Sequence, residues 1–252
     1  MKIPFYQTVW NKVDLINLAH ELGHPLNKLP TNQFYEAYYE NFLSNQKTFE
    51  HEWKASKRIQ TDWLRNQIDS LVGKDLPVLS VGAGTGIIEQ PLIQEGYNIH
   101  LQEFQKKSLE IFGASALTTC HYTDLSEIID KQYGMIVTIA MTYALDEKAL
   151  RAFFESCNKL LTKNGILVIL DTSLSWKEIY SYMHNKKYYE NNHLLWGYKR
   201  DISNYSKLAS NFILDSYEFY NEEMQKIQPI TFRGIPLNIV PCWQMMVFKK
   251  ND

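Results

Sequence analysis

Three glycines at alternate positions, Gly82, Gly84 and Gly86, are the residues whose type and spacing most clearly indicate chemistry. Glycine adopts backbone angles closed to other residues and lets a ligand approach the main chain closely. The apolar run 78–81 precedes them and predicts a buried strand, and a helix is expected from Gly86 to about residue 95. The free N–H groups of that helix would face a ligand above the turn, so the segment predicts a nucleotide-binding turn.

The carboxylate of Glu103 is the second chemical feature, because it ends the next alternating segment, 98–103. It follows the glycines by about 20 residues, where nucleotide-binding α/β folds place an acid on ribose hydroxyls. The alternative interpretation is an exposed strand end. The spacing Gly-x-Gly-x-Gly differs from the dinucleotide fingerprint Gly-x-Gly-x-x-Gly, and alone it also fits a tight turn without a ligand.

A different chemistry is indicated by His20-Glu21-Leu22-Gly23-His24, which fits the His-Glu-x-x-His pattern of zinc peptidases. In that chemistry two histidines one helical turn apart bind zinc, and the glutamate activates a bound water. Pro25 follows directly and would end the helix that should support the second histidine. We therefore expect no metal site. An incidental surface pair is the leading interpretation and a place in a substrate lid the second, with a zinc peptidase as the alternative of another class.

Alternating strands and helices are expected to position these side chains. The expected strands lie near 77–81, 98–103, 116–120, 134–140, 165–171, 212–220 and 243–249. The expected helices between the first five strands lie near 86–95, 105–112 and 146–162, the last of them capped by Asp146. Such alternation implies a parallel sheet with helices on both faces, and ligands then bind beyond the carboxyl ends of the strands.

The sequence Val-Leu-Ser-Val-Gly-Ala-Gly-Thr-Gly at 78–86 resembles the first motif of the class I S-adenosylmethionine-dependent methyltransferases. Further segments resemble the acid closing their second strand, their later acidic turn, their fourth strand and their fifth strand: Glu103, 123–125, 133–140 and 160–169. The resemblance covers residues 75–172 well and 173–252 loosely. Two positions depart from the family pattern, because Ser80 and Gly134 stand where acids are usual.

The resemblance implies a three-layer, Rossmann-like α/β sandwich with a mostly parallel, seven-stranded sheet whose last strand is antiparallel. Residues 71–252 would form this cofactor-binding domain, with an insertion near 173–200. Residues 1–70 match no motif, and their aromatic stripes at helical spacing indicate either a packing surface or a lid over a substrate pocket. We expect an N-terminal helical lid. Its helices are expected near 7–22, from the cap Thr31 through Phe42, and over 47–71; in the insertion we expect a helix over 175–184 and a loop over 186–192.

S-adenosylmethionine is the cofactor that the resemblance implies. Its methionine portion would lie over the glycine turn, its ribose on Glu103 and its adenine beside Phe104 and Asp124. The alternative for Asp124 is the N-cap of the turn that follows it, and both can hold together. The residues expected to bind the cofactor are Gly82, Ala83, Gly84, Gly86, Glu103, Phe104, Asp124, Leu125, Thr138, Ile139 and Ala140.

Methyl transfer from a sulfonium is an in-line displacement, in which the protein mainly aligns the nucleophile and excludes water. A catalytic base is needed only where the acceptor must first lose a proton, and the candidates are Tyr143, Asp171 and His193. Core packing of Tyr143 and turn formation by Asp171 are the alternatives. The residues expected to contact the acceptor are Tyr38, Tyr143, His193 and Trp196.

The composition of the chain limits the kinds of molecule that it is expected to bind. With 26 basic and 28 acidic residues the net charge is -2, which gives no electrostatic attraction to nucleic acid. Three scattered cysteines, no signal peptide and no long apolar run lead us to expect a cytoplasmic protein with no membrane segment. Near-neutral charge and abundant tyrosine and tryptophan favour a small-molecule acceptor. A peptide acceptor and a non-catalytic cofactor-binding protein are the alternatives.

Overall fold

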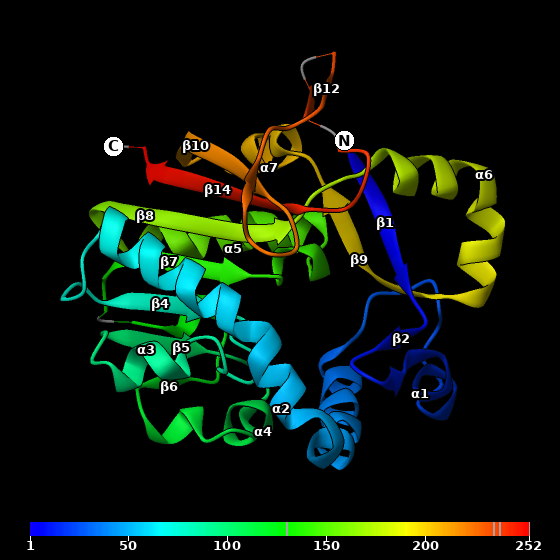
Figure 1. Ribbon diagram of the computed structural model, residues 1–252, viewed down its shortest axis with the longest axis horizontal. Coiled ribbons are helices and arrows are strands. Elements are labelled where there is room, and N and C mark those ends of the chain that lie inside the picture. The colour runs from blue at the N-terminus through cyan, green and yellow to red at the C-terminus, as the bar shows by residue number, and fades with distance from the viewer. Residues whose placement is uncertain (130, 234, 237, 252) are drawn as a thin grey trace.

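The computed structural model describes residues 1–129, 131–233, 235–236 and 238–251; within them the side chains of 43–54, 56, 232 and 235 are not described. Its centre is an eight-stranded sheet in the order β11-β10-β14-β8-β7-β4-β5-β6 (Figure 1). These strands are β4 (Val78–Val81), β5 (Ile99–Gln102), β6 (Cys120–His121), β7 (Tyr133–Ile139), β8 (Leu161–Thr172), β10 (Phe212–Tyr220), β11 (Lys226–Ile227) and β14 (Trp243–Lys250).

The strand directions confirm the predicted sheet. β4 pairs in parallel with β5 and β7, and β14 runs antiparallel to both β8 and β10. The two-residue strand β11 adds an eighth strand to the seven that were predicted. The strand expected at 116–120 was wrong in position, because Ala114–Ala116 form a 3₁₀ turn and pairing with β5 involves only Cys120 and His121.

Helices cover both faces of the sheet and make three layers (Figure 1). On one face, the end of α2 (Asn32–Leu71), α3 (Gln90–Gln94) and α4 (Lys106–Glu110) bury the side of β7 that carries Met135 and Val137. On the other, α5 (Glu147–Leu160) and α7 (Ile202–Leu208) bury the side that carries Ile136. Asp146 caps α5 as predicted, accepting a hydrogen bond from Ala149 N at 2.8 Å. Because both faces are covered, the central strands β4 and β7 are buried along nearly their whole length.

One continuous helix, α2, replaces the two helices expected over 31–71. Thr31 caps it as predicted, since its hydroxyl accepts from the N–H of Phe34 at 3.2 Å. The segment contains neither glycine nor proline, so nothing in the sequence breaks the helix. Its C-terminal part packs on the sheet through Leu64 and Ile68, and its first turns belong to a separate cluster beyond the sheet edge.

The helix expected over 7–22 was wrong for its first half. Residues 2–14 form β1 (Lys2–Gln7), β2 (Val9–Trp10) and β3 (Val13–Asp14), and only Leu15–Glu21 are helical, as α1. β2 and β3 pair antiparallel on either side of Asn11 and Lys12, whose φ angles of 48° and 65° are typical of a tight hairpin turn. Local periodicity cannot separate such a short hairpin from a helix start.

β1 pairs antiparallel with β9 (Leu194–Arg200), a strand of the insertion that we did not predict. We call these two strands the β1–β9 ribbon. It packs with α1 and the first turns of α2 around Trp196 and Phe34, beside the sheet edge where β4 and β7 end (Figure 1). The cover over this edge is therefore part strand and part helix, where we had expected helices alone.

Helix α6 (Trp176–Asn192) bends around the outer face of the ribbon. It continues through the segment expected as a loop, with one non-helical residue at Asn185. This break lets two tyrosines of α6 stack on Tyr6 of β1: Tyr182 at 6.3 Å and Tyr189 at 6.0 Å between ring centroids. Burial raises the pKa of Tyr6 to about 12, with smaller contributions from Tyr182, Glu190 and Tyr198.

Candidate functional site

The glycine turn follows β4 and has the backbone that only glycine adopts without strain. The φ angles of Gly82, Gly84 and Gly86 are 66°, 59° and 65°. A Cβ atom on Gly82 would lie 2.4 Å from Cγ of Met141, and one on Gly86 would lie 2.6 Å from Cβ of Ala114. A Cβ on Gly84 would meet only the Tyr39 hydroxyl, at 3.3 Å. Packing thus requires two of the glycines, while a Cβ on the third would press only on the end of one tyrosine side chain.

Glu103, which follows β5, is hydrogen-bonded directly to this turn. Its Oε2 accepts from the N–H of Gly84 at 2.9 Å, and its Oε1 accepts from the N–H of Gln105 at 3.1 Å. Burial raises the pKa of its carboxyl group. Beside it, Gln102 Oε1 accepts from Gly82 N at 3.2 Å. The parallel register between β4 and β5 therefore brings together the two features that the sequence singled out.

A cavity of about 430 Å³ opens at this edge, which we call the edge cavity. It is lined by side chains and backbone from α2, the glycine turn, the ends of β5 and β7, and α5. The predicted residues that line it are Gly82, Glu103, Phe104, Asp124, Leu125, Ala140 and Tyr143. The remaining cofactor predictions, Ala83, Gly84, Gly86, Thr138 and Ile139, lie in the adjacent turn and strand, outside its described lining.

Asp124 has the capping role that the sequence left open. Its Oδ1 accepts from the N–H of Ser126 at 2.9 Å, which caps the 3₁₀ turn η2 (Leu125–Glu127). The same residue lines the edge cavity. Capping and a ligand contact are thus compatible at this position.

Two tyrosines of α2, Tyr35 and Tyr39, line the edge cavity, and neither was singled out from the sequence. They are four residues apart and so share one face of the helix. Tyr38, which was predicted to contact the acceptor, lies on another face: its hydroxyl accepts from Asn11 Nδ2 at 2.7 Å, and its ring contacts Trp196. Tyr38 does not line the edge cavity, because the aromatic spacing did not reveal which face of α2 turns toward it.

Tyr143 reaches the edge cavity from the 3₁₀ turn η3 (Thr142–Ala144), directly after β7. The chain bends there through Ala140, whose φ of 52° is uncommon for a residue other than glycine. The Tyr143 hydroxyl accepts from Trp196 Nε1 at 3.2 Å, and burial raises its pKa. Trp196 is buried behind Tyr143 and does not line the edge cavity.

The other two candidate bases lie elsewhere. Asp171 is buried beneath η3, where its carboxylate accepts from Thr142 Oγ1, from Tyr205 OH at 3.2 Å and from Thr172 N at 2.7 Å. His193 follows α6 and contacts the rings of Tyr188 and Tyr189. Neither residue lines the edge cavity. The structure does not bring these two residues together with the glycine turn: Asp171 lies near the end of β8, and His193 lies between α6 and β9.

Arg200 is a further residue at η3 that the sequence did not reveal. It is completely buried at the end of β9, and its guanidinium donates to two backbone carbonyls: Thr142 O at 3.1 Å and Leu145 O. η3 is therefore held by Asp171 of β8, Tyr205 of α7 and Arg200 of β9. Gly197 lets β9 lie against the same turn, since a Cβ there would be 2.5 Å from Tyr143 O.

We expect Asp171→Asn to flatten the pH dependence of stability. Burial is the largest cause that raises the pKa of Asp171 in the folded protein. The protonated carboxyl group then stabilises the folded protein fully below the pKa of about 3.9 that aspartate has in the unfolded chain. This stabilisation is lost as the pH rises through the higher pKa of Asp171 in the folded protein. Asparagine keeps the shape and does not titrate. Urea unfolding at a series of pH values above about 4 should show a steeper fall for the parent.

The matched control for this measurement is Asp75→Asn, at an exposed position before β4. It should leave the parent's pH profile in place. If the free energy of unfolding depends on pH in the same way for the parent protein and for Asp171→Asn, burial does not disfavour the charged form of Asp171.

The histidine pair does not share a helix. α1 ends at Glu21, and Gly23 with φ of 61° turns the chain before His24. The ring of His24 contacts Phe34, and its Nε2 lies 3.2 Å from Lys28 O. Over all residues that the structure describes, no group of three or more histidine, cysteine, aspartate or glutamate side chains is placed to hold a metal ion.

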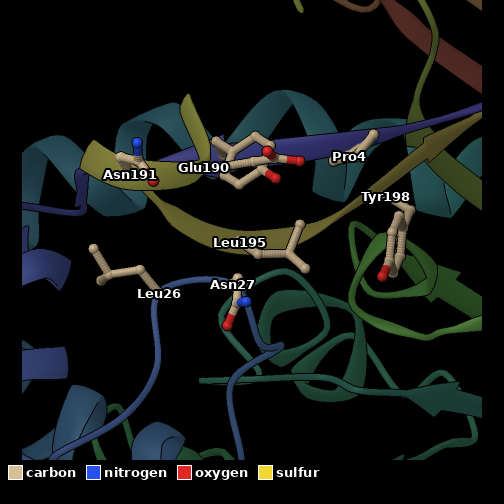
Figure 2. A pocket seen from close by; sticks show the side chains of 8 residues that line it. Pro4, Leu26, Asn27, Glu190, Asn191, Leu195 and Tyr198 are labelled. Atoms are coloured by element: carbon tan, nitrogen blue, oxygen red, sulfur yellow. The ribbon is translucent and has the colours of Figure 1, made fainter. Parts of the chain in front are cut away.

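A second cavity, of about 650 Å³, lies between the β1–β9 ribbon and the end of α6 (Figure 2). Phe5 contacts Tyr143, so its strand neighbours Pro4 and Tyr6 point to the opposite face of the ribbon. These two line the second cavity together with Glu190 and Tyr198. The ribbon therefore separates this cavity from the edge cavity, and no residue predicted for cofactor or acceptor lines it.

Within the described part of the chain, no helix combines the length and the apolar character needed to cross a bilayer. No protein-family model matches the sequence, and no curated protein matches it.

Solved structures resemble the fold. An S-adenosylmethionine-dependent methyltransferase from Methanosarcina mazei is 14% identical, with a TM-score of 0.55 over 73% of this chain and 96% of that chain. Magnesium protoporphyrin IX methyltransferase from Synechocystis PCC 6803, with bound S-adenosylhomocysteine, is 12% identical, with a TM-score of 0.53 over 81% and 86%. The N-methyltransferase NodS from Bradyrhizobium japonicum WM9 is 13% identical, with a TM-score of 0.50 over 81% and 88%. The chain thus has the fold of S-adenosylmethionine-dependent methyltransferases.

Proposed function

We propose that the protein is an S-adenosylmethionine-dependent methyltransferase that moves a methyl group to a small-molecule acceptor. The observation that supports this best is the hydrogen bond from Gly84 N to the Glu103 carboxylate. It lies at the edge of the sheet where the edge cavity opens, and the order of the strands agrees with the methyltransferase fold. In such sheets, ligands bind beyond the carboxyl ends of the strands, where the strand order reverses. β4 lies between β5 and β7, at that reversal.

The residues present fit the cofactor. Each carboxylate oxygen of Glu103 accepts one backbone N–H and has further acceptor capacity, which suits the two ribose hydroxyls. Phe104 and Leu125 offer apolar contacts for adenine, with Asp124 beside them as an acceptor. The methionine portion would lie over the glycine turn, where Gly82 lines the edge cavity and the Tyr39 hydroxyl approaches Gly84. The cofactor would supply a positively charged sulfur as the leaving group.

The acceptor would bind under the first turns of α2. Tyr35 and Tyr39 line the edge cavity from α2, and Tyr143 lines it from the end of β7. These three residues would position the acceptor and exclude water, which is the protein's main contribution to this type of transfer. Tyr38 and Trp196 would support them from behind, since both belong to the buried aromatic cluster under the ribbon. A cavity of about 430 Å³ matches a small molecule.

Calorimetry with S-adenosylmethionine and S-adenosylhomocysteine tests the proposal, with Gly84→Ala as the site variant. The new methyl group would enter the space under Tyr39, so we expect at least a tenfold loss of affinity. Gly113→Ala is the matched control, because its φ of 77° is also positive and its Cβ would meet nothing within 4 Å. Both variants should lose similar stability, about 1–2 kcal/mol. Absence of cofactor binding by the parent, or equal affinity in both variants, would contradict the proposed site.

A further inference from the structure

The titratable side chains that line the edge cavity are of two kinds only. Among the described residues, they are Tyr35 and Tyr39 of α2, Glu103 after β5, Asp124 before η2 and Tyr143 of η3. The described lining contains no lysine, arginine, histidine or cysteine. An anionic acceptor would therefore meet carboxylates and aromatic rings and no side-chain cation. A positively charged group would meet tyrosine rings and nearby acids, and both favour a cation.

None of these groups is available as a base for the acceptor. Glu103 accepts from Gly84 N and Gln105 N and serves the ribose in the proposed function. Asp124 caps η2. Burial raises the pKa of Tyr35, Tyr39 and Tyr143, so their hydroxyls stay protonated at neutral pH.

The two remaining candidate bases cannot reach the acceptor. Asp171 is buried below η3 with donors on both oxygens, and His193 packs against tyrosines of α6. Neither lines the edge cavity. A hydroxyl acceptor would need a nearby base to remove its proton, whereas an uncharged amine already has a free lone pair.

We infer that the acceptor atom is an amine nitrogen, an inference that rests on the proposed methyltransferase function. The nitrogen lone pair forms the new N–C bond as the S–C bond breaks, and the electron pair of that bond stays on sulfur and neutralises it. The product is an ammonium ion, which releases its proton to water after the transfer. Positive charge moves from sulfur to nitrogen and remains throughout among the rings of Tyr35, Tyr39 and Tyr143.

Transfer of a labelled methyl group to matched acceptors tests the inference. The full chain is incubated with methyl-labelled cofactor and a panel of primary and secondary amines that includes benzylamine. Each amine is paired with the alcohol and the carboxylate of the same carbon skeleton, here benzyl alcohol and benzoate. We expect label on at least one amine and at least a tenfold lower rate with its paired alcohol and carboxylate. Label on an alcohol or carboxylate at a rate equal to its amine, or on no amine, overturns the inference.

The pH profile separates an acceptor lone pair from an enzyme base. We expect kcat/KM to rise with pH up to the ammonium pKa of the amine itself. A second amine with a lower ammonium pKa should move this inflection down by the difference between the two values. Tyr143→Phe should leave the inflection where it is. An inflection that is the same for both amines, or that moves in Tyr143→Phe, would assign the proton transfer to the protein and overturn the inference.

Failure of the inference and failure of the proposed function give different results. If the parent protein binds no S-adenosylmethionine in calorimetry, the proposed function itself is wrong. If it binds the cofactor and methylates an oxygen or carbon acceptor, the function stands and the amine inference falls.

Discussion

Glu103→Ala is expected to raise the dissociation constant for S-adenosylmethionine by about 100-fold or more. Its carboxylate would accept from two ribose hydroxyls, and hydrogen bonds to a charged group contribute about 1.5–3 kcal/mol each. A 100-fold change corresponds to about 2.7 kcal/mol, so the loss of both bonds is enough. The variant also removes the acceptor for Gly84 N, which holds the glycine turn against β5. Isothermal calorimetry measures the effect directly.

Two further variants give this measurement its controls. Glu103→Gln keeps one oxygen acceptor and the side-chain length, so its affinity should fall between those of the parent and Glu103→Ala. Glu110→Ala removes an acid at an exposed position on α4 and should leave affinity unchanged. If Glu103→Ala binds the cofactor as tightly as the parent does, the ribose is not held here and the site assignment fails.

Arg200→Met is expected to lower the free energy of unfolding by about 2–4 kcal/mol. The guanidinium donates to the carbonyls of Thr142 and Leu145, and Arg200 is completely buried. Removing it leaves two buried acceptors without a donor, at about 1–3 kcal/mol each. The loss of the buried cation's own desolvation cost offsets a part of this. Denaturant unfolding of the two proteins measures the difference.

Arg200→Met should also weaken binding in the edge cavity, because η3 holds Tyr143 in the lining of that cavity. Arg200→Lys keeps the charge but loses the fork that reaches both carbonyls, so we expect an intermediate stability. Arg151→Met, at an exposed position on α5, is the control and should change little. If Arg200→Met unfolds at the same denaturant concentration as the parent, Arg200 does not hold η3.

The sheet was predictable because its information is local. β4, β7 and β8 contain short apolar runs, and the three glycines and Glu103 mark the strand ends that meet at the ligand edge. The order of the strands came from the motif resemblance. The antiparallel β14 was predicted on the same basis, and its pairing with β8 agrees.

The parts of the structure that were not predicted depend on contacts between residues that are far apart in the sequence. β1 and β9 pair Lys2 with Arg200, and no local pattern connects residues so far apart in the chain. The tyrosines of α2 were visible as an aromatic stripe, but only packing decides that Tyr35 and Tyr39 face the edge cavity while Tyr38 faces Asn11. The spacing of four between Tyr35 and Tyr39 was the available signal. Arg200 offered no signal, since its role depends on η3.

The pairing of β1 with β9 has a consequence for how the protein folds. The two strands flank the segment that forms β4 to β8, so their association closes a loop that contains these strands and α2 to α6. Contacts of such large sequence separation form late, since the chain must first lose the entropy of closing that loop. The sheet edge with Gly84 and Glu103 can therefore form before β9 pairs with β1. Only after that pairing do Trp196 and Arg200 fix the position of Tyr143.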